Sequence, residues 1–155
     1  MIYKNKIGVL ILSLLVLFCV GCENDYDYYD DDEIIISQFG DDESHKTGQN
    51  CMDCHTVDGS GEGQFSIAGT IYHEDQITPY ENVTVKLYSQ ADIVEIILEV
   101  DANGNFYTNE IVDWGDGLFP SVLGETEEQK MIQSVNNGAC NECHDGTTTP
   151  RIFSN

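Results

Sequence analysis

Apolar and polar residues alternate through the middle of the chain. Between residues 65 and 112 apolar side chains recur at every second position in four runs, at residues 65–72, 83–87, 94–100 and 106–112. A period of two is typical of a strand with one buried face. The pair Asn103-Gly104, between the third and fourth runs, favours a tight hairpin turn. We therefore expect antiparallel β-structure here.

Two further elements are expected toward the C-terminus. Residues 118–123 can add an edge strand, where the missing amide hydrogen of Pro120 is tolerated. Over residues 125–135 the apolar period becomes helical, with Thr126 as N-cap and Met131 on the apolar face. The pattern predicts a mainly β fold with one short C-terminal helix.

The N-terminus has the pattern of an export signal. Lys4 and Lys6 precede residues 7–20, which are almost entirely apolar but too few to span a bilayer. The following Cys19-Val20-Gly21-Cys22 resembles a bacterial lipobox. That resemblance implies removal of the signal peptide 1–21 and lipidation of Cys22, which would anchor the exported chain in the cell envelope, at the outer membrane. Plain secretory cleavage, giving a soluble periplasmic product, is the alternative.

The residues that follow Cys22 are strongly acidic. The chain has 28 acidic and 6 basic residues, a net charge of -22, and a dense acidic run lies directly after Cys22. Because like charges with little apolar content repel one another, residues 22–37 are expected to form an acidic disordered tether. A signal for export to the cell surface is the alternative interpretation. The same charge excludes nucleic acid as a partner.

Two copies of Cys-x-x-Cys-His, the attachment signature of c-type haem, are the strongest chemical signal. In each copy the two thiols can reach both vinyl groups of one porphyrin, while the histidine ligates the iron. A zinc site would need a fourth ligand, and a redox dithiol has no use for the histidine. We therefore expect two haem c groups. Their thioether residues are Cys51, Cys54, Cys140 and Cys143, and their proximal iron ligands are His55 and His144.

Each haem iron would also need a sixth ligand. His45 and His73 are the two histidines outside the motifs, so their number matches bis-histidine ligation of both irons. Met131 is a weaker candidate, since a methionine on an apolar face more often belongs to a core. Bis-histidine ligation would give both haems low potentials, because methionine ligation raises the potential.

Residues 67–112 resemble the carboxypeptidase-regulatory, transthyretin-like repeat. The resemblance rests on Gly69-Thr70-Ile71, on Pro79 before residues 83–87, and on the turn at residues 101–106. It implies an antiparallel, Ig-like β-sandwich that acts as a scaffold. The expected organisation is a loop with the first haem site at residues 38–64, the sandwich at residues 65–124, and the short helix with the second haem site at residues 125–155.

The motifs favour a non-enzymatic electron carrier that exchanges electrons with redox partner proteins, including other multihaem cytochromes. A small haem enzyme, such as a peroxidase or reductase with an open axial position, is the second hypothesis. A surface binding module is the third, for which exposed aromatic residues around Trp114 and Phe119 would be the sign.

Overall fold

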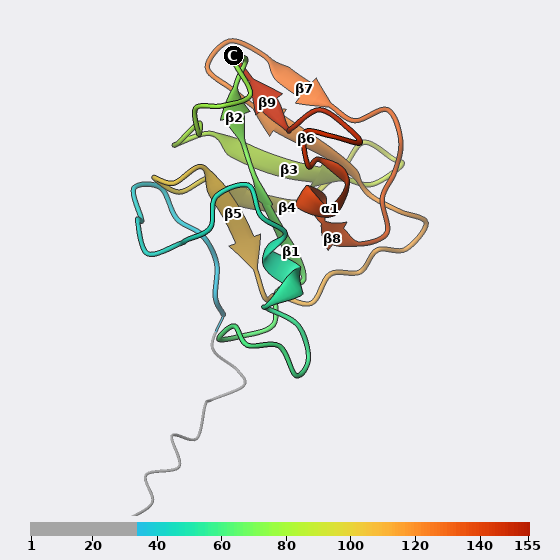
Figure 1. The fold of residues 1–155 in the computed structure, drawn as a ribbon. Helices are drawn as coiled ribbons and strands as arrows, with labels where there is room; N and C mark the ends of the chain where they lie inside the picture. Colours follow the sequence, from blue (N-terminus) through green and yellow to red (C-terminus); the bar gives the residue numbers. More distant parts are fainter. Residues whose placement is uncertain (1–33) are drawn as a thin grey trace, which may run out of the picture. The chain divides into compact units, whose positions relative to one another are not determined.

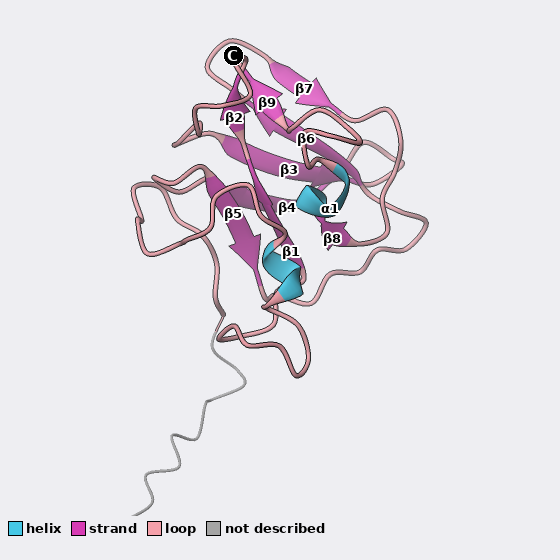
Figure 2. Cartoon of the chain, viewed as in Figure 1, coloured by secondary structure: helices cyan, strands magenta, loops and turns pink. Residues whose placement is uncertain are grey.

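The computed structural model describes residues 34–155. The expected signal peptide, the lipid-acceptor Cys22 and most of the acidic tether lie outside the described residues. The described part is mainly β (Figures 1 and 2). Its elements are the 3-10 helix η1 (Cys51–Asp53), the α-helix α1 (Cys140–Cys143), and the strands β1 (Ile67–Thr70), β2 (Tyr72–His73), β3 (Thr84–Tyr88), β4 (Val94–Glu99), β5 (Asn105–Thr108), β6 (Phe119–Leu123), β7 (Glu128–Lys130), β8 (Gly138–Ala139) and β9 (Phe153–Ser154).

The strands form two larger sheets and one short pair. The four-stranded sheet has the order β4-β3-β6-β7 and is antiparallel throughout. The three-stranded sheet has the order β5-β1-β8, in which β1 is antiparallel to β5 and parallel to β8. The pair β2-β9 is parallel. The expected antiparallel, mainly β fold is confirmed.

One hydrophobic core is shared by the two larger sheets. In β3 the side chains of Val85 and Leu87 are buried, whereas those of Thr84, Lys86 and Tyr88 are partly exposed, as the period of two predicts. Leu98 on β4 is completely buried, and Ile67 on β1 and Phe106 on β5 are each 1% exposed. At about 1.5–3 kcal/mol for each fully buried large apolar side chain, this core is the main stabilising term of the fold.

Strand β6 is an inner strand, so the expected edge position for residues 118–123 is wrong. It pairs with β3 on one side and with β7 on the other, and Pro120 lies opposite Leu87. The Pro120 carbonyl accepts a hydrogen bond from the Met131 amide at 2.8 Å. In an antiparallel ladder the N–H and C=O of one residue face the same neighbour. The missing N–H of Pro120 therefore falls on the β7 side, just where that short pairing ends.

The helix expected at residues 125–135 is also wrong. Residues 128–130 form β7, and beyond it the backbones of Leu118 and Val135 exchange two hydrogen bonds of 2.9 and 2.8 Å. A strand here forms hydrogen bonds with backbone N–H and C=O groups of β6, which a helix would leave unpaired. These tertiary hydrogen bonds outweigh the local preference for a helix. Within residues 34–155 the one α-helix is α1, which consists of residues of the second motif itself.

The turn after β4 forms as expected but has a different role. Gly104 has a φ of +76° and donates to the Asp101 carbonyl at 3.1 Å, and the Asp101 amide donates to the Asn105 carbonyl at 2.9 Å. However, β4 and β5 belong to different sheets. The turn is therefore a corner that carries the chain from one sheet to the other.

The expected tether ends earlier than residue 37. Ile36 forms a bridge with Thr108, and the Ser37 amide donates to the Tyr107 carbonyl at 3.0 Å. Ser37 is only 1% exposed, and its hydroxyl donates to the Glu99 carbonyl at 2.6 Å. Residues 35–37, which the expected tether included, are therefore held to the folded part of the chain by backbone hydrogen bonds and burial.

Candidate functional site

The first Cys-x-x-Cys-His motif forms a single turn of helix. Asn50 caps it, because its side-chain oxygen accepts from the Met52 amide at 3.2 Å. The amides of Cys54 and His55 both donate to the Cys51 carbonyl, at 3.2 and 3.0 Å. One helical turn brings both cysteines and the histidine of the motif into one neighbourhood.

The second motif repeats this geometry at the other end of the described chain. α1 covers Cys140–Cys143, and the His144 amide donates to the Cys140 carbonyl at 3.0 Å. The first-motif equivalent, from His55 to Cys51, has the same length. The first motif is a 3-10 turn and the second an α-helical turn, but both have the hydrogen bond from the histidine amide to the carbonyl of the first cysteine.

The two motif histidines share a second feature. Nδ1 of His55 lies 2.9 Å from the Glu62 carbonyl oxygen, and Nδ1 of His144 lies 2.7 Å from the Pro150 carbonyl oxygen. A carbonyl can only accept, so Nδ1 carries the proton in each ring and Nε2 is left with its lone pair. Metal-ligating histidines are oriented in this way. Both imidazoles are prepared to bind a metal ion through Nε2.

Strand β1 brings the two motifs together, since η1 and α1 both contact it (Figure 1). Asn141, which lies between the two cysteines of the second motif, donates from its side chain to the Gln49 carbonyl at 2.8 Å, two residues before the first motif. Its side-chain oxygen accepts from the Thr70 amide at 3.1 Å. Gly69 allows the close approach, because a Cβ there would lie 2.9 Å from Cβ of Cys140.

The first thiol of each motif has a raised pKa. Burial raises the pKa of Cys51, and it raises the pKa of Cys140 to about 12. Charge on Cys51 contributes to the raised pKa of Cys140, which indicates that the two thiols are neighbours. None of the four cysteines in residues 34–155 is in a disulfide. A catalytic dithiol needs a lowered thiol pKa, so this environment does not favour a redox dithiol.

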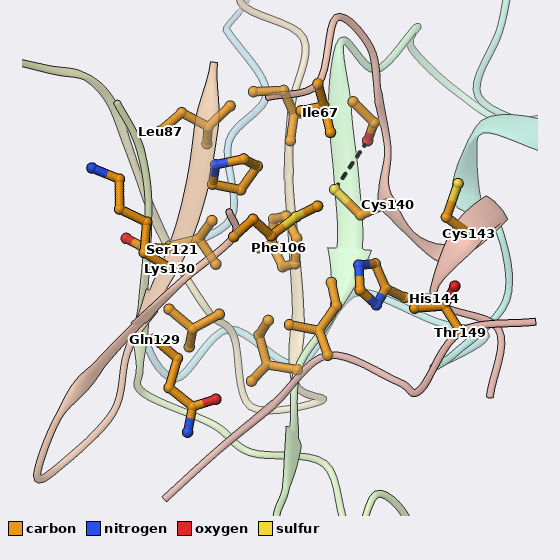
Figure 3. A pocket seen from close by; sticks show the side chains of 18 of the residues that line it. Ile67, Leu87, Phe106, Ser121, Gln129, Lys130, Cys140, Cys143, His144 and Thr149 are labelled. Carbon is orange, nitrogen blue, oxygen red and sulfur yellow. Dashed lines mark hydrogen bonds between the residues drawn. The ribbon is translucent and has the colours of Figure 1, made fainter. Parts of the chain in front are cut away.

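An apolar cleft of about 600 Å³ lies beside the second motif (Figure 3). Its walls include core side chains such as Ile67, Leu87 and Phe106 together with Cys140 and His144. The volume is within the range of ligand-binding pockets, about 300–1,000 Å³. A large, flat, mainly apolar ligand attached through Cys140 and Cys143 would cover core side chains that otherwise face the cleft.

Positive charge is scarce in this chain and is placed at the motifs. Lys46, Lys86, Lys130 and Arg151 are the cationic residues of the described range. Arg151 lines the cleft, and Nζ of Lys46 lies 3.9 Å from Sγ of Cys54, whereas the ammonium group of Lys130 is paired with Asp92. Haem carries two propionate groups, and carboxylates pair well with lysine and arginine. The described residues thus fit a haem at each motif: thiols, an oriented imidazole, and at least one cation nearby.

The candidate sixth ligands lie in different places. The ring of His45 is 6.0 Å from the ring of His55, between centroids. Met131 is part of the lining of the cleft that also contains His144. His73 is exposed at the end of β2, where its ring stacks on Tyr80 at 4.0 Å, and it is not among the residues that line the cleft.

Three residues of the site carry no signal in the sequence. Asn141 occupies a variable position of the motif, and Thr70 reads as an ordinary strand residue. Phe65, which stacks on the ring of His55 at 4.1 Å between centroids, reads as part of a buried strand face. Only the folded chain shows that they position the motifs, because their partners are distant in sequence.

No family model matches this chain, and no curated protein or solved structure is significantly similar to it. Among the described residues, no helix has the length and apolar character needed to cross a membrane. In the same range, no group of three or more His, Cys, Asp or Glu side chains is arranged to hold a metal ion by itself.

Proposed function

We propose that this protein is a dihaem c-type cytochrome that carries electrons between redox partner proteins outside the cytoplasm. One observation carries the proposal: in both Cys-x-x-Cys-His motifs the histidine amide donates to the carbonyl of the first cysteine, and the histidine Nδ1 is bonded to a backbone carbonyl. A lone motif can occur by chance. Two motifs whose histidines are oriented alike support covalent haem attachment at both.

Haem iron supplies the redox chemistry, since it takes up and releases one electron between its ferric and ferrous states. The residues of the chain hold and tune that group. Cys51, Cys54, Cys140 and Cys143 would attach the two porphyrins, and Nε2 of His55 and of His144 would each take one axial position. Because the Glu62 and Pro150 carbonyls fix both rings, little rotation would be needed on attachment.

The closeness of the two motifs supports a relay function. Both motifs lie on β1, and Asn141 links them through hydrogen bonds to Gln49 and Thr70. Two haems attached to segments that both contact one strand, and that are hydrogen-bonded to each other, would keep a constant separation. A constant, short separation favours transfer of an electron within the protein without any movement of the chain.

The proposal includes a location and a scaffold. Export through the signal peptide 1–21, lipidation at Cys22 and an acidic tether would hold the folded part outside the cytoplasm, at the bacterial outer membrane. The transthyretin-like resemblance assigns residues 65–124 to a β-sandwich scaffold, and the shared core of the two larger sheets supports it. Multihaem cytochromes are the class of partner that we expect.

The test is a haem count. The chain is expressed with a c-type cytochrome maturation system, and haem per chain is measured by the pyridine haemochrome method. We expect two covalent haems in the wild type and one in each double variant, Cys51→Ala/Cys54→Ala and Cys140→Ala/Cys143→Ala. Cys22→Ser is the matched control, which should retain two haems but leave the membrane fraction. A mature wild-type protein that carries zinc or nothing at these motifs would refute the proposal.

A further inference from the structure

Met131 and His144 both line the cleft, but they come from different sheets. Met131 follows β7, and its amide is bonded to Pro120 on β6 of the four-stranded sheet. His144 follows α1, which packs on β1 of the three-stranded sheet. Figure 3 shows Gln129 and Lys130 on one side of the cleft, and Cys143 and His144 on the other. The chain segments that carry Met131 and His144 therefore approach the cleft from opposite walls.

The strand register also directs Met131 into the cleft. Gln129 lies opposite the buried Val122 in the β6–β7 pairing, so the two side chains share one face of the sheet. Side chains two residues apart on an extended strand point to the same face. Met131, the first residue after β7, is two residues after Gln129 and both line the cleft, whereas the ammonium group of the intervening Lys130 is paired with Asp92. Its exposed neighbour Ile132, 95% accessible, has the opposite orientation.

The first motif has a different partner. The ring centroids of His45 and His55 are 6.0 Å apart. Two imidazoles on opposite sides of one metal ion, with metal–nitrogen bonds of about 2 Å, have ring centres roughly 6 Å apart. His45 is therefore already at the spacing of an axial partner, whereas the ring of His73 is stacked on Tyr80.

On the basis of the proposed function, we infer that the two haems are unequal: the first is ligated by His55 and His45, and the second by His144 and Met131. The second haem then has the higher reduction potential, and His73 is not an iron ligand. This assignment differs from the bis-histidine ligation of both haems that the number of histidines suggested.

The surroundings of the two sites shift the two reduction potentials in the same directions as the proposed ligands do. Thioether ligation and an apolar pocket both disfavour the ferric state, which raises the potential. The fully buried Asp101 is connected to the first site by hydrogen bonds: its carboxylate accepts from the Asn105 amide, and the Asn105 side chain is bonded to Thr70, whose hydroxyl accepts from the Gly48 amide ahead of the first motif. A buried negative charge stabilises the ferric iron and lowers its potential. An electron received from a one-electron donor protein would therefore settle at the second site before it passes to an acceptor protein.

The test combines optical spectroscopy with a redox titration of the purified wild type and two variants, Met131→Ala and His73→Ala. In the wild type we expect two one-electron waves, and in the ferric form the charge-transfer band that methionine sulphur produces. Met131→Ala should lose that band and shift only the higher wave downward, with two haems still counted. His73→Ala is the matched control and should leave the band and both waves unchanged.

A third variant addresses the first site. Asp101→Asn keeps an oxygen that can accept from the Asn103 and Asn105 amides, now at 2.9 Å each, and should raise only the lower wave. The inference is overturned if the Met131→Ala spectrum and waves equal those of the wild type, or if His73→Ala removes an axial ligand. Either result with two haems counted leaves the proposed function intact, whereas a wild type without haem refutes the proposed function itself.

Discussion

The side-chain amide of Asn141 donates to the backbone carbonyl of Gln49 at 2.8 Å, across 92 residues of sequence. A residue inside the second Cys-x-x-Cys-His motif thus holds the segment that leads into the first. Asn141 is 5% exposed and also bonds both the amide and the hydroxyl of Thr70. The two motifs are therefore joined by a buried polar connection as well as by the strand on which both lie.

Asn141→Ala should destabilise the fold by about 1–3 kcal/mol, because it leaves the amide of the buried Thr70 without its partner and removes the bond to the exposed Gln49. The measurement is the free energy of unfolding from denaturant titration. Glu142→Ala changes the neighbouring, exposed position of the same motif and should stay within about 0.5 kcal/mol of the wild type. Equal stabilities for the two variants would contradict the role given to Asn141.

Gly69→Ala should destabilise the protein by about 3 kcal/mol, since the new Cβ would lie 2.5 Å from Cζ of the buried Phe106 and 2.9 Å from Cβ of Cys140. Neither neighbour can move freely within the core. Gly40→Ala is the control: nothing lies within 4 Å of its added Cβ, and only its φ of +77° opposes the change. That backbone strain alone should cost about 1 kcal/mol. Thermal unfolding of both variants measures the difference.

The acid stability of the protein should depend on Asp75. Hydrogen bonds from the Thr78 amide, the Ile77 amide and the Thr78 hydroxyl lower the pKa of Asp75 to about 2, below its value of about 3.9 in an unfolded chain. A carboxyl with a lowered pKa in the folded state contributes stability above about pH 4, and this contribution is lost as the pH falls toward 2.

Asp75→Asn should therefore lose less stability between pH 4 and pH 2 than the wild type does. Carbon-detected NMR titration of the Asp75 carboxyl measures the pKa directly. Thr78→Val removes the 2.7 Å bond from the Thr78 hydroxyl and should move the pKa of Asp75 part of the way back toward 3.9. An unshifted wild-type pKa would show that the turn does not hold the ionised form.

Arg151→Gln should lower the reduction potential of the second site, if the proposed haem is present. Arg151 lines the cleft, is bonded to the Gln76 carbonyl at 2.9 Å and lies over the ring of Tyr72. Loss of its positive charge would favour the ferric state. Lys86→Gln is the matched control, because Lys86 pairs with Glu128 at 3.7 Å and does not line the cleft. A redox titration in which Lys86→Gln has the larger effect would contradict this role.

Much of the secondary structure could be predicted because its signal is local. The alternation in residues 83–87 and 94–100 is a property of neighbouring residues, and β3 and β4 form there. The turn at Gly104 follows from a backbone conformation that glycine adopts easily. The Cys-x-x-Cys-His motifs could be identified for the same reason, because the spacing of thiols and imidazole is set within five consecutive residues.

Other features depend on partners that are distant in sequence. Residues 128–130 form a strand because they pair with backbone groups of β6 that would otherwise be unpaired. The local sequence pattern does not indicate that these groups are there. Pro120 lies in an inner strand because β7 is short. Ile35 is held in the fold by Asn109, which follows β5 and is 74 residues away in the sequence.

For the candidate site, the sequence alone identifies the chemical groups: two pairs of thiols, each followed by a histidine, and the three further residues His45, His73 and Met131 that are candidate ligands in the proposed function. The tertiary structure decided where those groups lie. It places the motifs side by side on β1, His45 beside His55, and Met131 in the cleft of His144, while His73 stacks on Tyr80. The physical reason is that bonding within a motif is set by covalent spacing, whereas each of these neighbours meets its partner only after the sheets have paired and the core has closed.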